Sequence, residues 1–345
     1  MNDKQNHGKP ESLSYPSRRD FLTKAGLLIG GIAFMGAPGF RPQFAAAADS
    51  RASAGGSPAL ELDGQFIDFL KSAEGGFPKA EVFLEPPGPN SFIKKHVGPP
   101  KYQDIAIQFD PLMPKPLIDW VATTLAMSPL RKNGAILTAD FNRVEQSRLQ
   151  FNNALITEFG IPSCDATARE TGYLHMKFTP EFTSPLSGKG AILPNVGAKS
   201  KAWLRSNFRL TIPGLDCSRV SKIEALTFKQ TVIQSPAGQR RTSQLEPAVP
   251  EYPNLVFDIP ESSAGTFYAW FQDMVIKGNA GENNEKSGAL EFLDPTLRGT
   301  LLTINFHHLG IFGFTPEPSE ATAQTIKRVK VEMYCEQMTL GPPKV

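Results

Sequence analysis

The sequence predicts a mainly β (β+α) protein made of two tandem small β-barrel or sandwich units, each with one flanking helix. The 345 residues include 24 Phe, 29 Gly and 30 Pro against 3 Trp, a composition typical of β structure with many turns. Short segments alternate with period two, as where Val329, Val331 and Met333 enclose Lys330 and Glu332. The same succession of patterns also occurs twice along the chain, which indicates an internal repeat.

Two Tyr–Trp pairs define the repeat. The spacing from Tyr102 to Trp120 is the same as the spacing from Tyr252 to Trp270. In both copies an alternating apolar run follows the tyrosine, and an amphipathic stretch carries the tryptophan. The equal spacing predicts that each pair occupies the same two positions of one fold.

Each copy is predicted to contain one short helix around its tryptophan. In the first copy, Leu117, Val121 and Leu125 are spaced to form one apolar face beside Trp120. Pro116 lies near the expected start, and proline suits the first turn of a helix. The tryptophans are therefore expected in the core, and a sugar-stacking platform is the alternative.

A strand with a Gly near its start and an Asp at its end follows each helix. The spacing from Gly134 to Asp140 equals the spacing from Gly288 to Asp294. The second copy is longer between helix and strand, where 277–284 form a polar Gly/Asn-rich loop that tolerates insertion. The two aspartates are expected to form turns, and a pair of glycosidase carboxylates is the alternative.

These patterns divide the chain into five segments. The residues between the copies are rich in Gly, Ser and Pro and are expected to form a linker, and 235–250 are expected to form a long hairpin tip or loop. The predicted segments are an export signal at 1–48, a flexible segment at 49–60, a first β unit at 61–183, the linker at 184–203 and a second β unit at 204–341.

The first segment has the layout of a bacterial secretory leader. Arg18 and Arg19 stand before Phe21 and Leu22, and an apolar stretch follows that is too short to span a bilayer. The leader closes with small residues, where cleavage is expected at the Ala46 and Ala48 pattern. The paired arginines indicate the twin-arginine (Tat) route, which would place the protein in the periplasm or outside the cell. If the leader is not functional, a cytoplasmic or virion-associated protein is the alternative.

No catalytic residue, cofactor or metal site is expected. The sequence contains no nucleophile elbow and no phosphate-binding glycine loop. His307 and His308 are adjacent, so on a strand they would face opposite sides and could not chelate one metal. Cys164, Cys217 and Cys335 fit no zinc spacing and are expected to be ordinary buried thiols.

Charge and hydropathy exclude two classes of partner. The formal net charge is only +2, so no polyanionic partner is indicated and no nucleic-acid binding is predicted. After the leader, no segment is long and apolar enough to form a membrane-spanning helix.

Three runs in the second copy carry a resemblance to a known family. They are FYAWF at 267–271, KSGALEFLD at 286–294 and the charged alternating run KRVKVEMYCE at 327–336. These runs, in this order, resemble the tail-tube family of contractile phage tails and related injection machines. The first copy follows the same plan from about 66 to 182, so the resemblance covers nearly all of the chain after the leader.

The resemblance implies a non-catalytic structural protein whose β units form six-membered rings that stack into a hollow tube. Because this chain supplies two units, three copies are expected to close such a ring, with threefold symmetry and a pseudo-sixfold appearance. Other tail-like structural proteins would be its further partners. A Tat-exported carbohydrate-binding or hydrolytic β-rich protein is the alternative, and a deep pocket lined by convergent carboxylates would favour it.

Overall fold

The structure is a computed structural model that describes residues 56–85, 93–192, 202–236, 243–318 and 326–341. Ala52–Val345 form one compact unit. We call 56–192 the N-terminal half and 202–341 the C-terminal half. The residues predicted for export and cleavage lie outside the described residues: they are Arg18, Arg19, Phe21, Leu22, Ala46 and Ala48.

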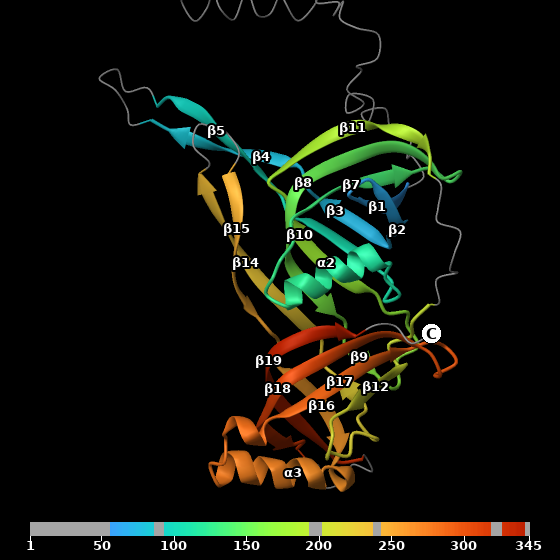
Figure 1. Cartoon of the computed structure of the whole chain (residues 1–345), viewed down its shortest axis with the longest axis vertical. Helices are drawn as coiled ribbons and strands as arrows, with labels where there is room; N and C mark the ends of the chain where they lie inside the picture. The colour runs from blue at the N-terminus through green and yellow to red at the C-terminus, as the bar shows by residue number, and fades with distance from the viewer. Residues whose placement is uncertain (1–55, 86–92, 193–201, 237–242, 319–325, 342–345) are drawn as a thin grey trace, which may run out of the picture. The chain divides into compact units, whose positions relative to one another are not determined.

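The described part of the N-terminal half is mainly β structure with the helix α2 (Figure 1). Its main sheet has the strand order β2-β1-β7-β8-β10-β6-β3, and β11 also pairs with β8. Strands β4 and β5 form a separate hairpin. The elements are β1 (Ser57–Leu62), β2 (Gln65–Phe69), β3 (Ser72–Gly75), β4 (Pro78–Leu84), β5 (Lys95–Tyr102), β6 (Ile105–Phe109), α2 (Lys115–Leu125), β7 (Lys132–Ala139), β8 (Val144–Ile161), β9 (Cys164–Asp165), β10 (Leu174–Thr179) and β11 (Phe182–Ala191).

The C-terminal half has a similar order of elements around a seven-stranded sheet. That sheet has the strand order β12-β17-β18-β19-β16-β13-β9. The elements are β12 (Phe208–Thr211), β13 (Lys222–Ile223), β14 (Leu226–Pro236), β15 (Ser243–Glu251), β16 (Leu255–Pro260), η2 (Glu261–Ser263), α3 (Gly265–Phe271), the π-helical turn η3 (Gln272–Ile276), η4 (Glu282–Asn284), β17 (Lys286–Leu293), β18 (Thr300–Pro316) and β19 (Arg328–Gly341).

Each sheet takes in strands from the other half. Strand β9 of the N-terminal half pairs with β13, with Cys164 opposite Ile223. Strand β14 of the C-terminal half pairs with β8 and extends the first sheet to ten strands, together with β15 (Figure 1). Backbone hydrogen bonds therefore join the two halves through both sheets.

The expected helices and strand faces are confirmed. Helix α2 buries Leu117, Trp120, Val121 and Leu125, each at most 1% exposed. In the final strand β19, the side chains at the alternating apolar positions are buried; they are Val329, Val331 and Met333. Trp270 on α3 is 7% exposed, so both tryptophans belong to the core.

Three segments expected to be loop or linker are partly strand. Residues 184–191 of the expected linker belong to β11, which pairs along β8. Residues 57–60 of the expected flexible segment belong to β1, where Ala59 and Leu60 are fully buried. Most of 235–250 lies in the β14–β15 hairpin. In each case a neighbouring strand supplies hydrogen-bond partners, and local composition does not reveal such a partner.

The two hairpins β4–β5 and β14–β15 share one register. In the first, Lys79 pairs with Lys101, and an irregularity follows between Ala80 and Val82. In the second, Lys229 pairs with Glu251, and an irregularity follows between Gln230 and Val232.

Five pairs of one hairpin therefore match five pairs of the other at the same shift along the chain, which is also the shift from Tyr102 to Tyr252. The same shift relates the adjoining strand pairs, since Ala73 faces Ile107 in one half and Ile223 faces Phe257 in the other. Positions in the two hairpins can thus be compared residue by residue.

Candidate functional site: the contact between the two halves

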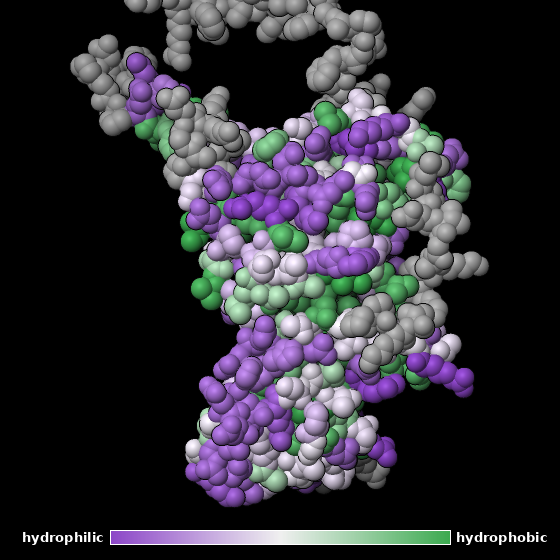
Figure 2. All heavy atoms as spheres, viewed as in Figure 1, coloured by the Kyte–Doolittle hydropathy of each residue, from purple (hydrophilic) through white to green (hydrophobic). Residues whose placement is uncertain are grey.

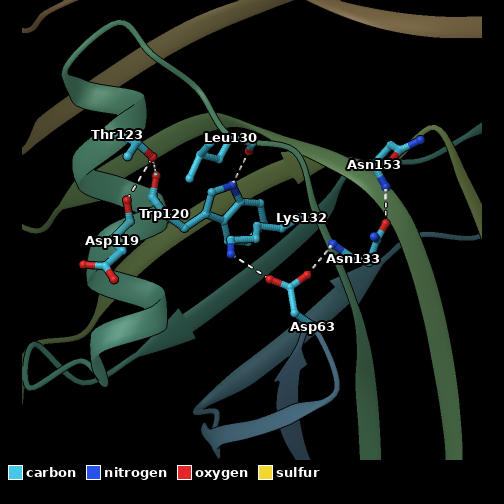
Figure 3. Close-up of polar contacts among 8 residues, drawn as sticks. All are labelled: Asp63, Asp119, Trp120, Thr123, Leu130, Lys132, Asn133 and Asn153. Carbon is cyan, nitrogen blue, oxygen red and sulfur yellow. Dashed lines mark hydrogen bonds and ion pairs between the residues drawn. The ribbon is translucent and has the colours of Figure 1, made fainter.

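Each core tryptophan ties its helix to the strand that follows. The indole Nε1–H of Trp120 donates to the carbonyl of Leu130 at 2.9 Å, shortly before β7 begins (Figure 3). The indole of Trp270 donates to the carbonyl of Asn284 at 3.0 Å, shortly before β17 begins. Arg131 and Glu285 therefore occupy corresponding places, each directly before its strand.

A second pair of corresponding positions lies in the long strands β8 and β18. Asn153 and His308 both have positive φ, 50° and 55°, which is uncommon for residues other than glycine. Asn153 lies opposite the start of β7, and His308 lies opposite the start of β17. At each place the pairing register shifts, because β8 or β18 has one residue more than the strand it pairs with. Figure 3 shows Asn153 beside Asn133. The backbone N–H of Asn153 donates a hydrogen bond to the side-chain oxygen of Asn133 at 2.9 Å.

Strand β14 adds itself to the end of β8 in an antiparallel register. Leu226 faces Ile161, and Lys229 faces Glu158. Burial raises the pKa of the Glu158 carboxyl, but hydrogen bonds from His175 and Lys177 outweigh it and hold that pKa below its ordinary value. Those bonds measure 3.0 Å to His175 and 3.3 Å to Lys177, so the carboxylate at this junction is held by two neighbours.

The β14–β15 hairpin is also held at Leu245, whose side chain is 2% exposed. Its backbone N–H donates to the carboxylate of Glu181 at 3.2 Å. Its carbonyl accepts a hydrogen bond from the guanidinium of Arg131. Glu181 is fixed in turn by Asn153, whose side-chain amide donates to it at 2.8 Å. Two residues of the N-terminal half therefore hold Leu245 of the C-terminal half directly, and a third fixes one of them.

A third contact lies at the base of the same hairpin. The Tyr252 hydroxyl donates to the carbonyl of Leu125, at the end of α2, over 2.6 Å. The Tyr252 ring packs on Phe228, with ring centroids 5.4 Å apart. Strand pairing, a backbone clamp and a tyrosine hydrogen bond thus fasten the two halves together.

The C-terminal half carries a different cluster at the corresponding place, which we call the Glu285 cluster: Glu285, His308 and Glu336. Their ligand atoms lie within 4.8 Å of one another. His308 Nδ1 is 2.8 Å from one oxygen of Glu285, and the Tyr334 hydroxyl donates to the other at 2.8 Å. Burial, together with Glu285 and Glu336, raises the pKa of Tyr334 to about 12. By distance alone, two carboxylates and an imidazole could hold a divalent cation.

Sequence reasoning did not find this cluster. Its three members lie before β17, in β18 and in β19, and only the strand registers bring them together. The adjacent histidines do have different partners, because His307 lies 3.0 Å from the Thr339 hydroxyl while His308 meets Glu285. The other described histidines each meet one glutamate, His96 with Glu85 and His175 with Glu158.

The two strand-end aspartates are turn formers, as expected. Asp140 accepts the backbone N–H of Asn142 at 2.8 Å, and Asp294 accepts that of Thr296 at 3.0 Å. A surface hollow is lined by Glu261, Ser262, Ile326 and Lys327 and holds one carboxylate. It therefore lacks the carboxylate pair that glycoside hydrolysis ordinarily uses.

The three thiols are free in the structure. Cys164 and Cys335 are buried, as expected, whereas Cys217 is half-buried. Burial raises the pKa of Cys164 to about 12 and the pKa values of Cys217 and Cys335 to about 11. None of the three is therefore poised as a nucleophile.

Comparison with known proteins finds structural neighbours of low sequence identity. The chain is similar to a chain of the PVC sheath–tube complex of an extracellular contractile injection system, with 14% identity and a TM-score of 0.35 over 43% of this chain and 99% of that one. It is also similar to a chain of the tube-terminating cap of the anti-feeding prophage, with 16% identity and a TM-score of 0.34 over 38% and 88%. For Hcp1 from Flavobacterium johnsoniae the values are 12% and 0.24, over 39% and 96%.

No protein-family model matches the sequence, and no curated protein matches it. Within the described residues, no helix is long and apolar enough to cross a membrane.

Proposed function

We propose that this chain is a non-catalytic structural protein, made of two tail-tube-like β units, that assembles with further copies of itself into rings. The observation that carries the proposal is the antiparallel pairing of β14 with β8, a strand contact between two halves with a similar order of elements. Such a contact can be repeated between chains wherever the corresponding strands are exposed.

The corresponding strands do have unpaired edges in the described residues. Strand β4 corresponds to β14 and pairs only with β5. Strand β18 corresponds to β8; its residues 310–316 pair with β19 on one side, while its contact with β17 ends at Leu309. Unpaired edges invite strand addition, so β4 of one chain and β18 of another form a complementary pair.

This contact joins two different surfaces and is therefore heterologous, which gives a closed ring or an open filament. Each chain contributes one internal and one external contact of the same kind. Three chains then supply six β units, so the proposed assembly is a trimeric ring of pseudo-sixfold appearance. Stacking of such rings, or capping by other tail-like structural proteins, would build a tube.

We also propose export by the Tat route, on the order of basic, apolar and small residues in the leader. Replacement of Arg18 and Arg19 by lysine should leave the protein in the cytoplasm, as followed by fractionation. Unchanged export of this variant would exclude the Tat route and leave a cytoplasmic or virion-associated protein.

The second candidate is an exported carbohydrate-binding or hydrolytic protein. The hollow at Glu261 has a single carboxylate, and both repeated tryptophans are buried rather than offered as sugar platforms. These observations favour the structural role.

Light scattering of the purified full chain at micromolar concentration, with negative-stain electron microscopy, tests the proposal. The expected result is a mass of three chains and annular particles. A strictly monomeric mass without rings would overturn it.

A further inference from the structure

We propose that Lys95 of one copy docks on the Glu285 cluster of the next copy and supplies a permanent positive charge between its two carboxylates. The inference rests on the proposed ring assembly and names a contact that would hold it together. The internal junction at Leu245 is the template for this contact between chains.

The hairpin register identifies the occupant. Gln234 pairs with Leu245 in β14–β15, and Leu84 pairs with Lys95 in β4–β5. Because the two hairpins share one register, Lys95 corresponds to Leu245. In the internal junction Leu245 is the residue whose backbone is clamped by Arg131 and Glu181.

The strand registers also identify the receiving site. Arg131 corresponds to Glu285, because each directly follows the residue that accepts the tryptophan hydrogen bond. Glu181 corresponds to Glu336 by the register of the next strand. Phe182 pairs with Asn152, the neighbour of the extra residue Asn153, and Gln337 pairs with His307, the neighbour of the extra residue His308. Glu181 directly precedes Phe182, and Glu336 directly precedes Gln337. The members of the internal clamp and of the Glu285 cluster thus lie at the same places of the two halves.

The internal clamp and the Glu285 cluster carry different charges at corresponding positions, and so do the residues that meet them. The internal clamp has an arginine beside a carboxylate, with Arg131 Nε and Glu181 Oε1 3.9 Å apart, and both bond the backbone of an uncharged residue, Leu245. The Glu285 cluster has a second carboxylate in place of that arginine, and the incoming residue is a lysine instead. Two carboxylates so close repel each other unless a cation joins them, and Lys95 brings one.

Both partners are available for this contact. Lys95 is exposed and has no ion pair among the described residues, and Glu336 is exposed with no cation partner there. Glu285 has a side chain only 7% exposed and bonds His308 and Tyr334, so it is held in place before any partner arrives. A preorganised acceptor reduces the entropy cost of binding.

Neighbouring residues give the same charge pattern. In the internal junction Lys229 faces Glu158. The corresponding external pair is Lys79 with Gly313, and the carboxylate of Glu332 lies over Gly313. Lys79 is exposed on β4, so a second lysine of the hairpin would meet a second carboxylate of the receiving sheet.

The hairpin also offers apolar surface beside these lysines. Val82, Phe83, Leu84 and Val97 are each more than half exposed. In Figure 2 green apolar and purple hydrophilic side chains both appear on the described part of this hairpin, at the upper left. An exposed face that combines apolar side chains with lysines suits a protein surface bearing carboxylates.

Variants of the full chain that reverse the charge of Lys95 or Glu336, and a double variant that reverses both, test the inference. Lys95→Glu should raise the concentration needed for half-assembly by about tenfold or more, because like charges then face each other at every interface. Glu336→Lys should do the same, and the double variant should regain assembly because the pair is restored with its charges exchanged. Lys115→Glu is the matched control: Lys115 pairs with Asp119 on α2, so its reversal should leave assembly unchanged.

The outcomes separate this inference from the proposed function. If the wild type forms rings and Lys95→Glu forms them equally well, the Lys95 contact is wrong while ring assembly stands. If a chelator dissociates wild-type rings and the double variant fails to assemble, a metal ion occupies the cluster and the inference is overturned. If the wild type is monomeric, the proposed ring assembly itself is wrong.

Discussion

The hydroxyl of Tyr252 lies 2.6 Å from the backbone carbonyl of Leu125 and donates a hydrogen bond to it. This bond fastens the β14–β15 hairpin to the end of α2, across the two halves of the chain. Tyr102 corresponds to Tyr252, but among the described residues its hydroxyl has no partner. In the proposed ring it would bond the backbone around Val275, near the end of the π-helical turn η3, in the next copy.

Tyr252→Phe should lower the free energy of unfolding by about 1 kcal/mol, since it removes one hydrogen bond and leaves the carbonyl of Leu125 unpaired. In a chain of this size that corresponds to a fall in Tm of about 2 °C, measurable by differential scanning calorimetry. Tyr102→Phe is the matched control; it should leave the Tm of the monomer unchanged and weaken only assembly. Equal falls in Tm for both variants would contradict this assignment.

Gly134 and Gly288 occupy corresponding places in β7 and β17 but differ in the space around them. A Cβ on Gly134 would lie 2.1 Å from the carbonyl oxygen of Glu61 and 2.6 Å from the Phe151 ring. A Cβ on Gly288 would lie 2.9 Å from a side-chain carbon of Ile212 and 3.2 Å from the carbonyl oxygen of Thr211, which are milder contacts. Gly134→Ala should therefore cost about 3 kcal/mol and Gly288→Ala about 1 kcal/mol, as measured by urea unfolding. A larger cost at Gly288 would show that the two sites are packed differently from this description.

The sequence predicted which positions are buried but not the contacts between the two halves. The Tyr–Trp spacing and the alternation in β19 place the tryptophans and the core face correctly, because burial imposes a period on the sequence itself. The pairing of β14 with β8 leaves no such trace, since strands from distant parts of a chain pair through backbone groups that every residue has.

The Glu285 cluster escaped prediction for a related reason. It depends on an extra residue in β18 that places His308 at positive φ, and histidine carries no strong signal for that conformation. Without the register, nothing in the sequence connects Glu285, His308 and Glu336, which come from different strands or their flanks.

The cysteines should be unreactive in the folded protein. Burial raises the pKa of Cys164 to about 12 and that of Cys335 to about 11, so at pH 8 the thiolate that reacts with iodoacetamide is scarce. Labelling of the native chain should be about a hundredfold slower than after unfolding in guanidinium chloride, with half-buried Cys217 the fastest of the three. Mass spectrometry of the labelled peptides reads out each site. Rapid native labelling of Cys164 would contradict its place in the core.

Glu158 should make the stability of the junction between the halves depend on pH. Burial raises the pKa of its carboxyl, yet the hydrogen bonds from His175 and Lys177 hold that pKa below the ordinary value. The unfolded chain therefore binds a proton at Glu158 at a higher pH than the folded chain does. Its stabilising contribution is fully present above the unfolded pKa of about 4.3 and is lost as the pH falls through the lower folded pKa.

Glu158→Gln isolates this contribution. At pH 7 the variant should be less stable than the wild type, because it loses the charge that His175 and Lys177 bond. The difference in unfolding free energy should shrink as the pH is lowered from about 4.3, because Glu158 of the unfolded wild type then takes up a proton while the folded carboxyl is still charged. Glu170→Gln is the control, since Glu170 is 76% exposed in its pair with Arg205 and should change stability little at any pH. A Glu158→Gln difference that stays constant from pH 7 down to pH 3 would show that the carboxylate charge does not stabilise this junction.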